Sequence, residues 1–178
     1  MSDVHPYVKL ARITVKRLLS GEALPVSGAD VDGNAEFWNK ERACFVSIKT
    51  LMGALRGCIG TILPTQRSLD LEIIANAVAA STRDPRFPPM SSPELKEVTF
   101  SVDVLGLPEP ISDRSELDPS VWGVIVTQSF RRGVLLPDLE GVDTVEEQLG
   151  IAARKAGIGK IDSTVTIERF RVDRYKEA

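Results

Sequence analysis

Two runs of β-forming residues, separated by a very short turn, most restrict the folds open to this sequence. The stretch ACFVSIKTLMGALRGCIGTIL has apolar and β-branched residues on both sides of Met52-Gly53, which is the pattern of a β-hairpin. With Met52 and Gly53 as the two turn residues, the register of the hairpin follows directly. The predicted pairs are Phe45 with Gly60, Val46 with Ile59, Ser47 with Cys58, Ile48 with Gly57, and Lys49 with Arg56.

This register predicts one apolar face and one face with polar and reactive side chains, because successive side chains of a strand point to opposite sides. The second face would hold the Cys58 thiol and the cations of Lys49 and Arg56 on one surface, with Ser47 directly opposite the cysteine. We expect Gly57 to let a helix pack closely on the apolar side. Gly60 is expected to leave space beside Cys58 for a ligand.

The rest of the chain alternates between helical and strand patterns. Caps and apolar periodicity predict about four helices, and alternation predicts further strands. The final strand loses its alternation near Arg169, which predicts a bulge. The predicted helices cover 6–20, 68–82, 92–97 and 144–156, and the further predicted strands lie within 97–107, 122–128, 131–137 and 163–175.

Strand pairs joined by tight turns and mixed with these helices predict an α+β fold with a mixed or largely antiparallel sheet. With 178 residues, 43% of them apolar, the chain can bury a real core. We interpret residues 1–178 as one domain, with a helix at 6–20 and a main body at 43–175, and with room for two lobes. The glycine fingerprint of dinucleotide-binding proteins and the Walker A pattern are both missing from the sequence.

Composition excludes several classes of function. A net charge of −3 and a pI near 5.3 argue against nucleic acid as a bulk partner. The sequence has no apolar run of membrane-spanning length and no signal-peptide pattern, so we expect a cytoplasmic protein with no membrane partner. Two cysteines and the single histidine, His5, predict no metal site and leave no identifiable cofactor. A hydrolase would depend on His5, near the start of the chain.

Cys58 has two interpretations. Cysteine often behaves as a small buried hydrophobe, so Cys58 can be a packing residue. Alternatively, Arg56 and Lys49 would favour the thiolate and lower its pKa, as in nucleophilic or redox-sensing cysteines. Arg56 itself can instead be the ion-pair partner of an acid such as Asp103.

Two further arginines leave similar alternatives. Arg86, in the proline-rich segment DPRFPP, can anchor that loop to a carboxylate or contact a ligand. Arg132, in Arg131-Arg132-Gly133, is by default part of a solvated hairpin turn, with anion binding as the second interpretation.

Several motifs together resemble the AMMECR domain family. The resemblance rests on LRGCIGT, AASTRDPRFPP, FSVDVL followed by PEPI, WGVIV, RRGVLLP and a helix with KAG, in this order between Cys44 and Val172. It implies two unequal lobes with a core related to the RAGNYA fold. Two departures from common family patterns are Met52-Gly53 in place of Asn-Gly, and Trp122 in place of a histidine.

The resemblance also implies the AmmeMemoRadiSam system, in which such proteins are associated with a Memo-type protein similar to extradiol dioxygenases and with a radical S-adenosylmethionine enzyme. This chain lacks the CxxxCxxC pattern of a radical enzyme, so it would be the accessory component. One hypothesis is a cleft beside LRGCIG that binds a small, nucleotide-like or peptide substrate, with Cys58 as nucleophile or carrier and Arg56 as orienting cation. The alternative is a non-catalytic adaptor in which LRGCIG is structural. The candidate substrate-binding residues are Ser47, Lys49, Gly57, Gly60, Arg86 and Arg132.

Overall fold

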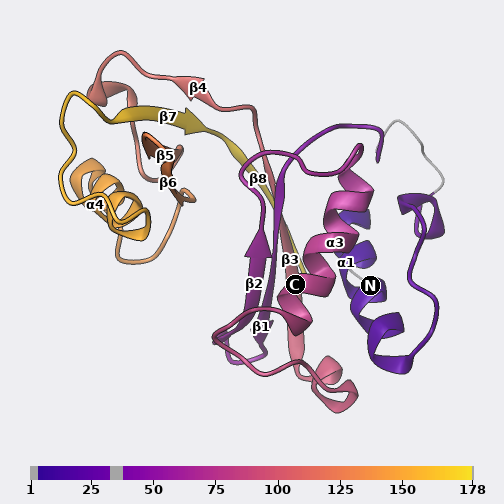
Figure 1. The fold of residues 1–178 in the computed structure, drawn as a ribbon. Helices are drawn as coiled ribbons and strands as arrows, with labels where there is room; N and C mark the ends of the chain where they lie inside the picture. Colours follow the sequence, from indigo (N-terminus) through magenta and orange to yellow (C-terminus); the bar gives the residue numbers. More distant parts are fainter. Residues whose placement is uncertain (1–3, 33–37, 178) are drawn as a thin grey trace. The chain divides into compact units, whose positions relative to one another are not determined.

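The computed structural model describes residues 4–32 and 38–177, which form two compact units (Figure 1). Unit 1 comprises residues 1–104 and 174–178, and unit 2 comprises residues 105–173. The described elements are three α-helices, short 3₁₀ helices and two antiparallel four-stranded sheets. The predicted α+β class is therefore confirmed.

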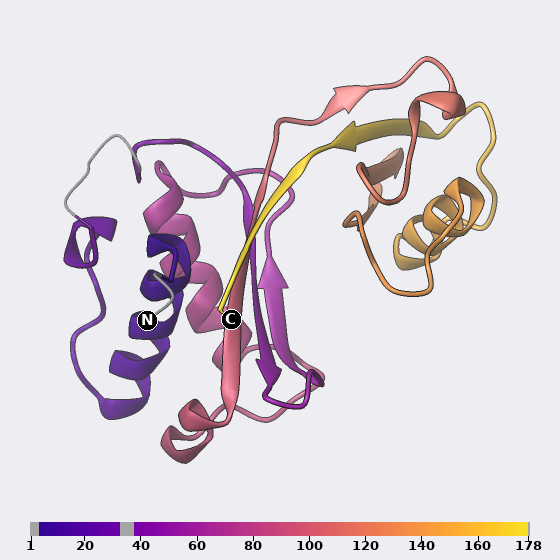
Figure 2. The same cartoon turned by 180° about the vertical axis from the view of Figure 1, so that it is seen from behind.

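Unit 1 is a sheet with two helices on one face. Its strand order is β2-β1-β3-β8, so β2 is an edge strand. Helices α1 and α3 lie side by side against the same face (Figures 1 and 2). The elements are α1 (Pro6–Ser20), η1 (Gly28–Asp30), β1 (Cys44–Thr50), β2 (Leu55–Gly60), α3 (Leu69–Thr82), η2 (Ser92–Lys96), β3 (Val98–Leu105) and β8 (Val172–Lys176).

The register of the β1–β2 hairpin is as predicted over four pairs, which are Phe45–Gly60, Val46–Ile59, Ser47–Cys58 and Ile48–Gly57. The predicted two-residue turn is wrong. The loop has three residues, 51–53, and ends with Gly53 at φ 85°, a conformation that glycine adopts without strain. The register therefore shifts after Ile48, so that Lys49 pairs with Leu55 and not with Arg56.

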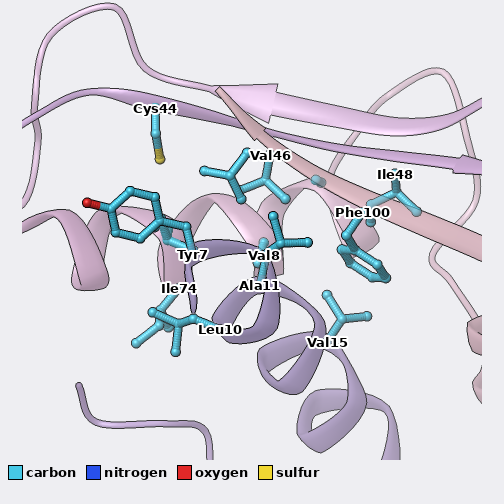
Figure 3. Close-up of a cluster of buried hydrophobic side chains, with 14 of the residues drawn as sticks. Tyr7, Val8, Leu10, Ala11, Val15, Cys44, Val46, Ile48, Ile74 and Phe100 are labelled. Atoms are coloured by element: carbon cyan, nitrogen blue, oxygen red, sulfur yellow. The ribbon is translucent and has the colours of Figure 1, made fainter. Parts of the chain in front are cut away.

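The core of unit 1 lies between this sheet and its helices (Figure 3). Cys44 points into it, and burial raises the pKa of the Cys44 thiol to about 12. Cys58 lies on the opposite face of the hairpin, and both cysteines are free. Figure 3 labels the core residues Tyr7, Val8, Leu10, Ala11, Val15, Cys44, Val46, Ile48, Ile74 and Phe100.

Gly57 permits the close approach of α3 that the sequence predicts. A Cβ atom at this position would lie within 3.0 Å of the main-chain oxygen of Ala80, a separation that real Cβ atoms essentially never show. Since the obstructing atom belongs to the helix backbone, it cannot move aside as a flexible side chain would. Gly57 therefore sets the spacing between β2 and α3.

The buried carboxylate of Glu72 fixes the chain that leaves β2. It accepts hydrogen bonds from the Thr61 hydroxyl at 2.6 Å, the Thr65 amide at 2.8 Å and the Gln66 amide at 2.7 Å. Glu72 lies in the first turn of α3, where a negative charge is favoured by the helix dipole. The loop after LRGCIG is thus tied to the start of the helix that packs on Gly57.

Unit 2 has a sheet of order β4-β7-β5-β6. Helix α4 packs closely at Gly133, where a Cβ atom would lie within 3.0 Å of the Ala152 oxygen. The elements are β4 (Glu109–Pro110), η3 (Arg114–Glu116), β5 (Gly123–Gln128), β6 (Arg131–Leu135), α4 (Val145–Lys155) and β7 (Thr166–Phe170).

Two further sequence predictions need correction. The short helix predicted at 92–97 is the five-residue 3₁₀ helix η2, which the capping box of Ser91 and Glu94 begins. The final strand does not continue through a bulge near Arg169. It divides into β7 and β8, with Arg171 between them, and these strands belong to different sheets. None of the helices within residues 4–32 and 38–177 combines the length and the hydropathy of a membrane span.

Replacement of Gly57 by alanine should lower the free energy of unfolding by about 2 kcal/mol, because the new methyl group meets helix backbone. Gly150→Ala in α4 is the matched control, since a Cβ there meets nothing within 4 Å. It should leave stability unchanged or raise it by up to about 1 kcal/mol. Urea denaturation followed by circular dichroism measures both. Equal effects of the two substitutions would refute the proposed role of Gly57.

Candidate functional site

The LRGCIG strand places Cys58 on the face of the sheet that α1 and α3 leave uncovered. The Ser47 hydroxyl, directly opposite on β1, donates a hydrogen bond to the Cys58 sulfur at 3.1 Å. Ser101 on β3 pairs with Ser47 in the same row. All three residues are partly exposed. A row of thiol and hydroxyl groups therefore crosses β2, β1 and β3.

The outer edge of β2 pairs with no other strand of the described sheet, and the DPRFPP loop binds to it instead. Asp84 accepts a hydrogen bond from the Cys58 amide at 2.9 Å, and Arg86 donates one to the Cys58 carbonyl at 3.3 Å. Asp84 and Arg86 also pair with each other at 2.7 Å. Two side chains of this loop thus satisfy the N–H and C=O groups of Cys58, which an edge strand would otherwise leave unpaired.

Arg86 thus anchors the DPRFPP loop to the carboxylate of Asp84. This is the first of the two interpretations that the sequence leaves open for Arg86. Its side chain remains 54% exposed, whereas that of Asp84 is only 2% exposed. The Arg86 hydrogen bond holds the pKa of the Asp84 carboxyl well below its usual range. Sequence reasoning missed Asp84, although an acid two residues before Arg86 in a proline-rich loop was the available signal.

Arg56 is engaged in an ion pair on the same side of the hairpin. Its Nε donates to Glu94 at 2.6 Å, which lowers the pKa of Glu94 to about 2. The ring of Phe87 lies 5.8 Å from the Arg56 guanidinium carbon and 5.7 Å from that of Arg86, within cation–π range. The ion-pair interpretation of Arg56 thus agrees with the structure.

Asp103, the acid suggested as the partner of Arg56, is engaged elsewhere. It is 4% exposed and accepts from Arg174 at 2.7 Å. The difference has a simple cause. Arg174 comes from β8, which lies next to β3 in the sheet, whereas Arg56 lies on the far edge strand.

The thiol of Cys58 does not have the lowered pKa expected of a cation-flanked cysteine. Burial raises its pKa, and the hydrogen bond from Ser47 and the charge of Arg86 oppose this effect only in part. Asp103 and Asp84 add to the increase. Arg56 and Lys49, which were expected to lower it, are not among the groups that act on the thiol. Cys58 is therefore a neutral thiol at pH 7.

Gly60 has a packing role that the sequence did not predict. A Cβ at Gly60 would lie within 3.0 Å of the Phe45 ring, so the glycine accommodates this side chain across the hairpin. Seven of the eight candidate site residues belong to unit 1, namely Ser47, Lys49, Arg56, Gly57, Cys58, Gly60 and Arg86.

Arg132 belongs to unit 2, in which it contacts Thr127 at 3.2 Å and Glu168 at 3.3 Å.

His5 precedes the first residue of α1. It accepts a hydrogen bond from the Tyr7 amide at 3.4 Å, and its ring stacks on Tyr175. Over residues 4–32 and 38–177, no group of three or more histidine, cysteine or acidic side chains could hold a metal ion.

Comparison with known proteins identifies the class to which this fold and hairpin belong. The AMMECR1 family model matches residues 8–175, so the chain belongs to the AMMECR1 family, as its motifs predict. A Thermotoga maritima protein is 51% identical over 177 residues, which cover 99% of this chain and all of the relative. The crystal structure of uncharacterized protein PH0010 from Pyrococcus horikoshii has a TM-score of 0.84 and 26% identity, with 96% of this chain and 89% of that one covered.

A relative from Clostridium acetobutylicum is a longer protein. It is 49% identical over 174 residues, which cover 97% of this chain but only 36% of that protein. In that chain, the region similar to the present protein is therefore joined to a considerably larger remainder.

Alkylation with iodoacetamide should show that Cys58 is reachable but weakly reactive. Because its pKa is raised, labelling at pH 8 should be several-fold slower than that of a free thiol with a pKa near 8.5. Its rate should continue to increase above pH 9, and Cys44 should react only after unfolding. Peptide mass spectrometry gives the rate at each site, and Cys58→Ser checks the assignment. A labelling midpoint below pH 8 would show that the thiol is activated after all.

Asp84→Asn should lower the free energy of unfolding by about 2 kcal/mol, reduced from the full effect of a buried pair because Arg86 is half exposed. The folded-state pKa of Asp84 lies below its unfolded value near 3.9. Its contribution is therefore complete above about pH 4 and is lost as the pH falls below that. Urea titrations at pH 7 and pH 3 should show the variant losing less stability on acidification than the wild type. The exposed Asp143→Asn is the matched control, and a variant with the same acid dependence as the wild type would contradict the role of Asp84.

Proposed function

We propose that this protein is a non-catalytic binding module. It would act as an accessory protein together with a Memo-type protein and a radical S-adenosylmethionine enzyme. The proposal rests on the hydrogen-bond and ion-pair partners of the motif residues. Asp84 and Arg86 cap β2, Arg56 is paired with Glu94, and Cys58 is a neutral thiol. These groups hold a strand in place. Arg56 is paired with Glu94, and Arg86, whose charge offsets the raised pKa of Cys58 only in part, is paired with Asp84.

The longer relative supports a partner protein. In the Clostridium acetobutylicum chain the region similar to this protein is covalently joined to a remainder almost twice its size. Domains that act together are brought to a high effective concentration by such a linkage. The matching region of the present chain would then make the corresponding contact with its partner. We place it in the cytoplasm, where its two free cysteines would stay reduced.

A second candidate function has one observation in its favour. Cys58 is partly exposed whereas Cys44 is fully buried, so Cys58 is the thiol that a small, nucleotide-like or peptide substrate could reach. In this hypothesis the bound substrate or partner would have to supply the positive charge that activates the sulfur. Cys58 would then act as nucleophile or covalent carrier.

Cys58→Ala separates the two functions. A binding module should keep its complex with the Memo-type protein, with a dissociation constant within about threefold of wild type, and should remain active in a reconstituted three-protein assay. Gel filtration detects the complex, and calorimetry gives its affinity. Loss of pathway activity with an intact complex would favour the nucleophile. Absence of any complex with the wild-type protein would refute the binding module.

A further inference from the structure

The end of the β1–β2 hairpin presents large apolar side chains to solvent, two from the loop and one from the first residue of β2. Met52 is 93% exposed, Leu51 is 65% exposed and Leu55 is 37% exposed. We call these three residues the hairpin tip. Single exposed apolar residues are ordinary on protein surfaces, but neighbouring ones typically mark interaction sites. The three residues lie within a five-residue stretch of one hairpin.

The hairpin tip is held in one conformation by its own main chain. The Thr50 amide donates to the Ala54 oxygen at 2.8 Å, and the Gly53 amide donates to the Thr50 oxygen at 2.8 Å. The Thr50 hydroxyl accepts from the Ala54 amide at 3.1 Å. The Leu51 amide donates to the Glu97 oxygen at 2.9 Å, which ties the loop to the end of η2. A loop ordered in this way loses little conformational entropy when it binds.

The charges beside the hairpin tip are mainly positive. Lys49 is exposed and pairs with Leu55 across the hairpin. Lys96 is exposed and directly precedes Glu97, the residue that holds the Leu51 amide, and the Glu97 side chain is exposed as well. One cation, Lys49, thus lies across the hairpin from Leu55, and a second, Lys96, lies beside Glu97 in the segment whose main chain holds Leu51. Such a surface is complementary to an apolar depression that is edged by carboxylates.

We propose that the hairpin tip is the anchor through which this protein docks on its partner protein. Leu51 and Met52 insert into an apolar depression of the partner, and Lys49 and Lys96 face carboxylates at its edge. A few central apolar residues surrounded by polar ones typically supply most of the affinity of an interface. This inference rests on the proposed function and adds to it the surface and the partner chemistry.

The decisive experiment measures binding of the purified Memo-type protein by calorimetry. Met52→Asp and the double variant Leu51→Asp/Met52→Asp place charge on side chains that are already exposed, so neither should unfold the protein. We expect binding at least tenfold weaker for Met52→Asp and undetectable for the double variant. Val26→Asp is the matched control, since Val26 is 80% exposed in the same unit, and it should bind like the wild type. Circular dichroism verifies the fold of each variant.

The charged residues provide an independent measurement. Lys49→Glu/Lys96→Glu should slow association several-fold at low salt and weaken its dependence on ionic strength, because exposed charges chiefly affect the association rate. Surface plasmon resonance at two salt concentrations measures this. Unchanged rates at both salt concentrations would contradict the assignment of carboxylates to the partner.

The outcomes separate failure of the surface from failure of the function. If the wild type binds the Memo-type protein and the tip variants bind equally well, the hairpin tip is not the anchor and the proposed function stands. If the wild type does not bind it, both proposals are wrong. Wild-type binding to vesicles of neutral and anionic phospholipid that the tip variants lose would make the tip a membrane contact. Self-association lost in the variants by sedimentation equilibrium would make it a contact between copies, and either result overturns the docking proposal.

Discussion

The hydrogen bond from the Cys58 amide to the Asp84 carboxylate is the interaction on which the candidate site depends. An edge strand has a row of unpaired peptide groups, and an unpaired group shielded from water is costly. Asp84 and Arg86 meet this requirement at Cys58 with one donor and one acceptor. The same pair fixes the DPRFPP loop and brings Phe87 within range of both Arg56 and Arg86. The two most distinctive motifs of the chain, LRGCIG and DPRFPP, are therefore joined, because side chains of the second bind the main chain of the first.

A second constraint operates in both units. Gly57 in β2 meets the Ala80 oxygen of α3, and Gly133 in β6 meets the Ala152 oxygen of α4. In each unit a strand glycine lets a helix lie closer to its sheet than any larger residue would allow. A glycine inside a strand usually weakens it, and here close helix packing compensates for that loss. The glycines of LRGCIG are thus explained by packing, with Gly60 accommodating Phe45.

The chemistry of Cys58 shows why sequence proximity does not determine reactivity. The charges near it in sequence suggested a stabilised thiolate, but Arg56 is bound to Glu94, and the shift of register separates Lys49 from Arg56. Burial then has the largest effect on the sulfur, and two nearby carboxylates add to it. A neutral thiol beside Ser47 is suited to hydrogen bonding. The apolar hairpin tip, which the sequence predicts only as a turn, is the surface that we propose contacts a partner.

The sequence by itself determined the α+β class through its alternation and the family through its motifs, because both are local properties of the chain. The pairing of Ser47 with Cys58 was also predicted, although the loop has three residues, because the register shift after Ile48 compensates for the extra residue. It also indicated why Gly57 lacks a side chain. Only the tertiary structure decided the partners of Arg56 and Arg86, the divided last strand and the direction of the Cys58 pKa. Glu94 lies 38 residues from Arg56 and Asp84 lies 26 residues from the Cys58 amide that it accepts from. Such contacts act through space and through burial, which the order of residues along the chain does not encode locally.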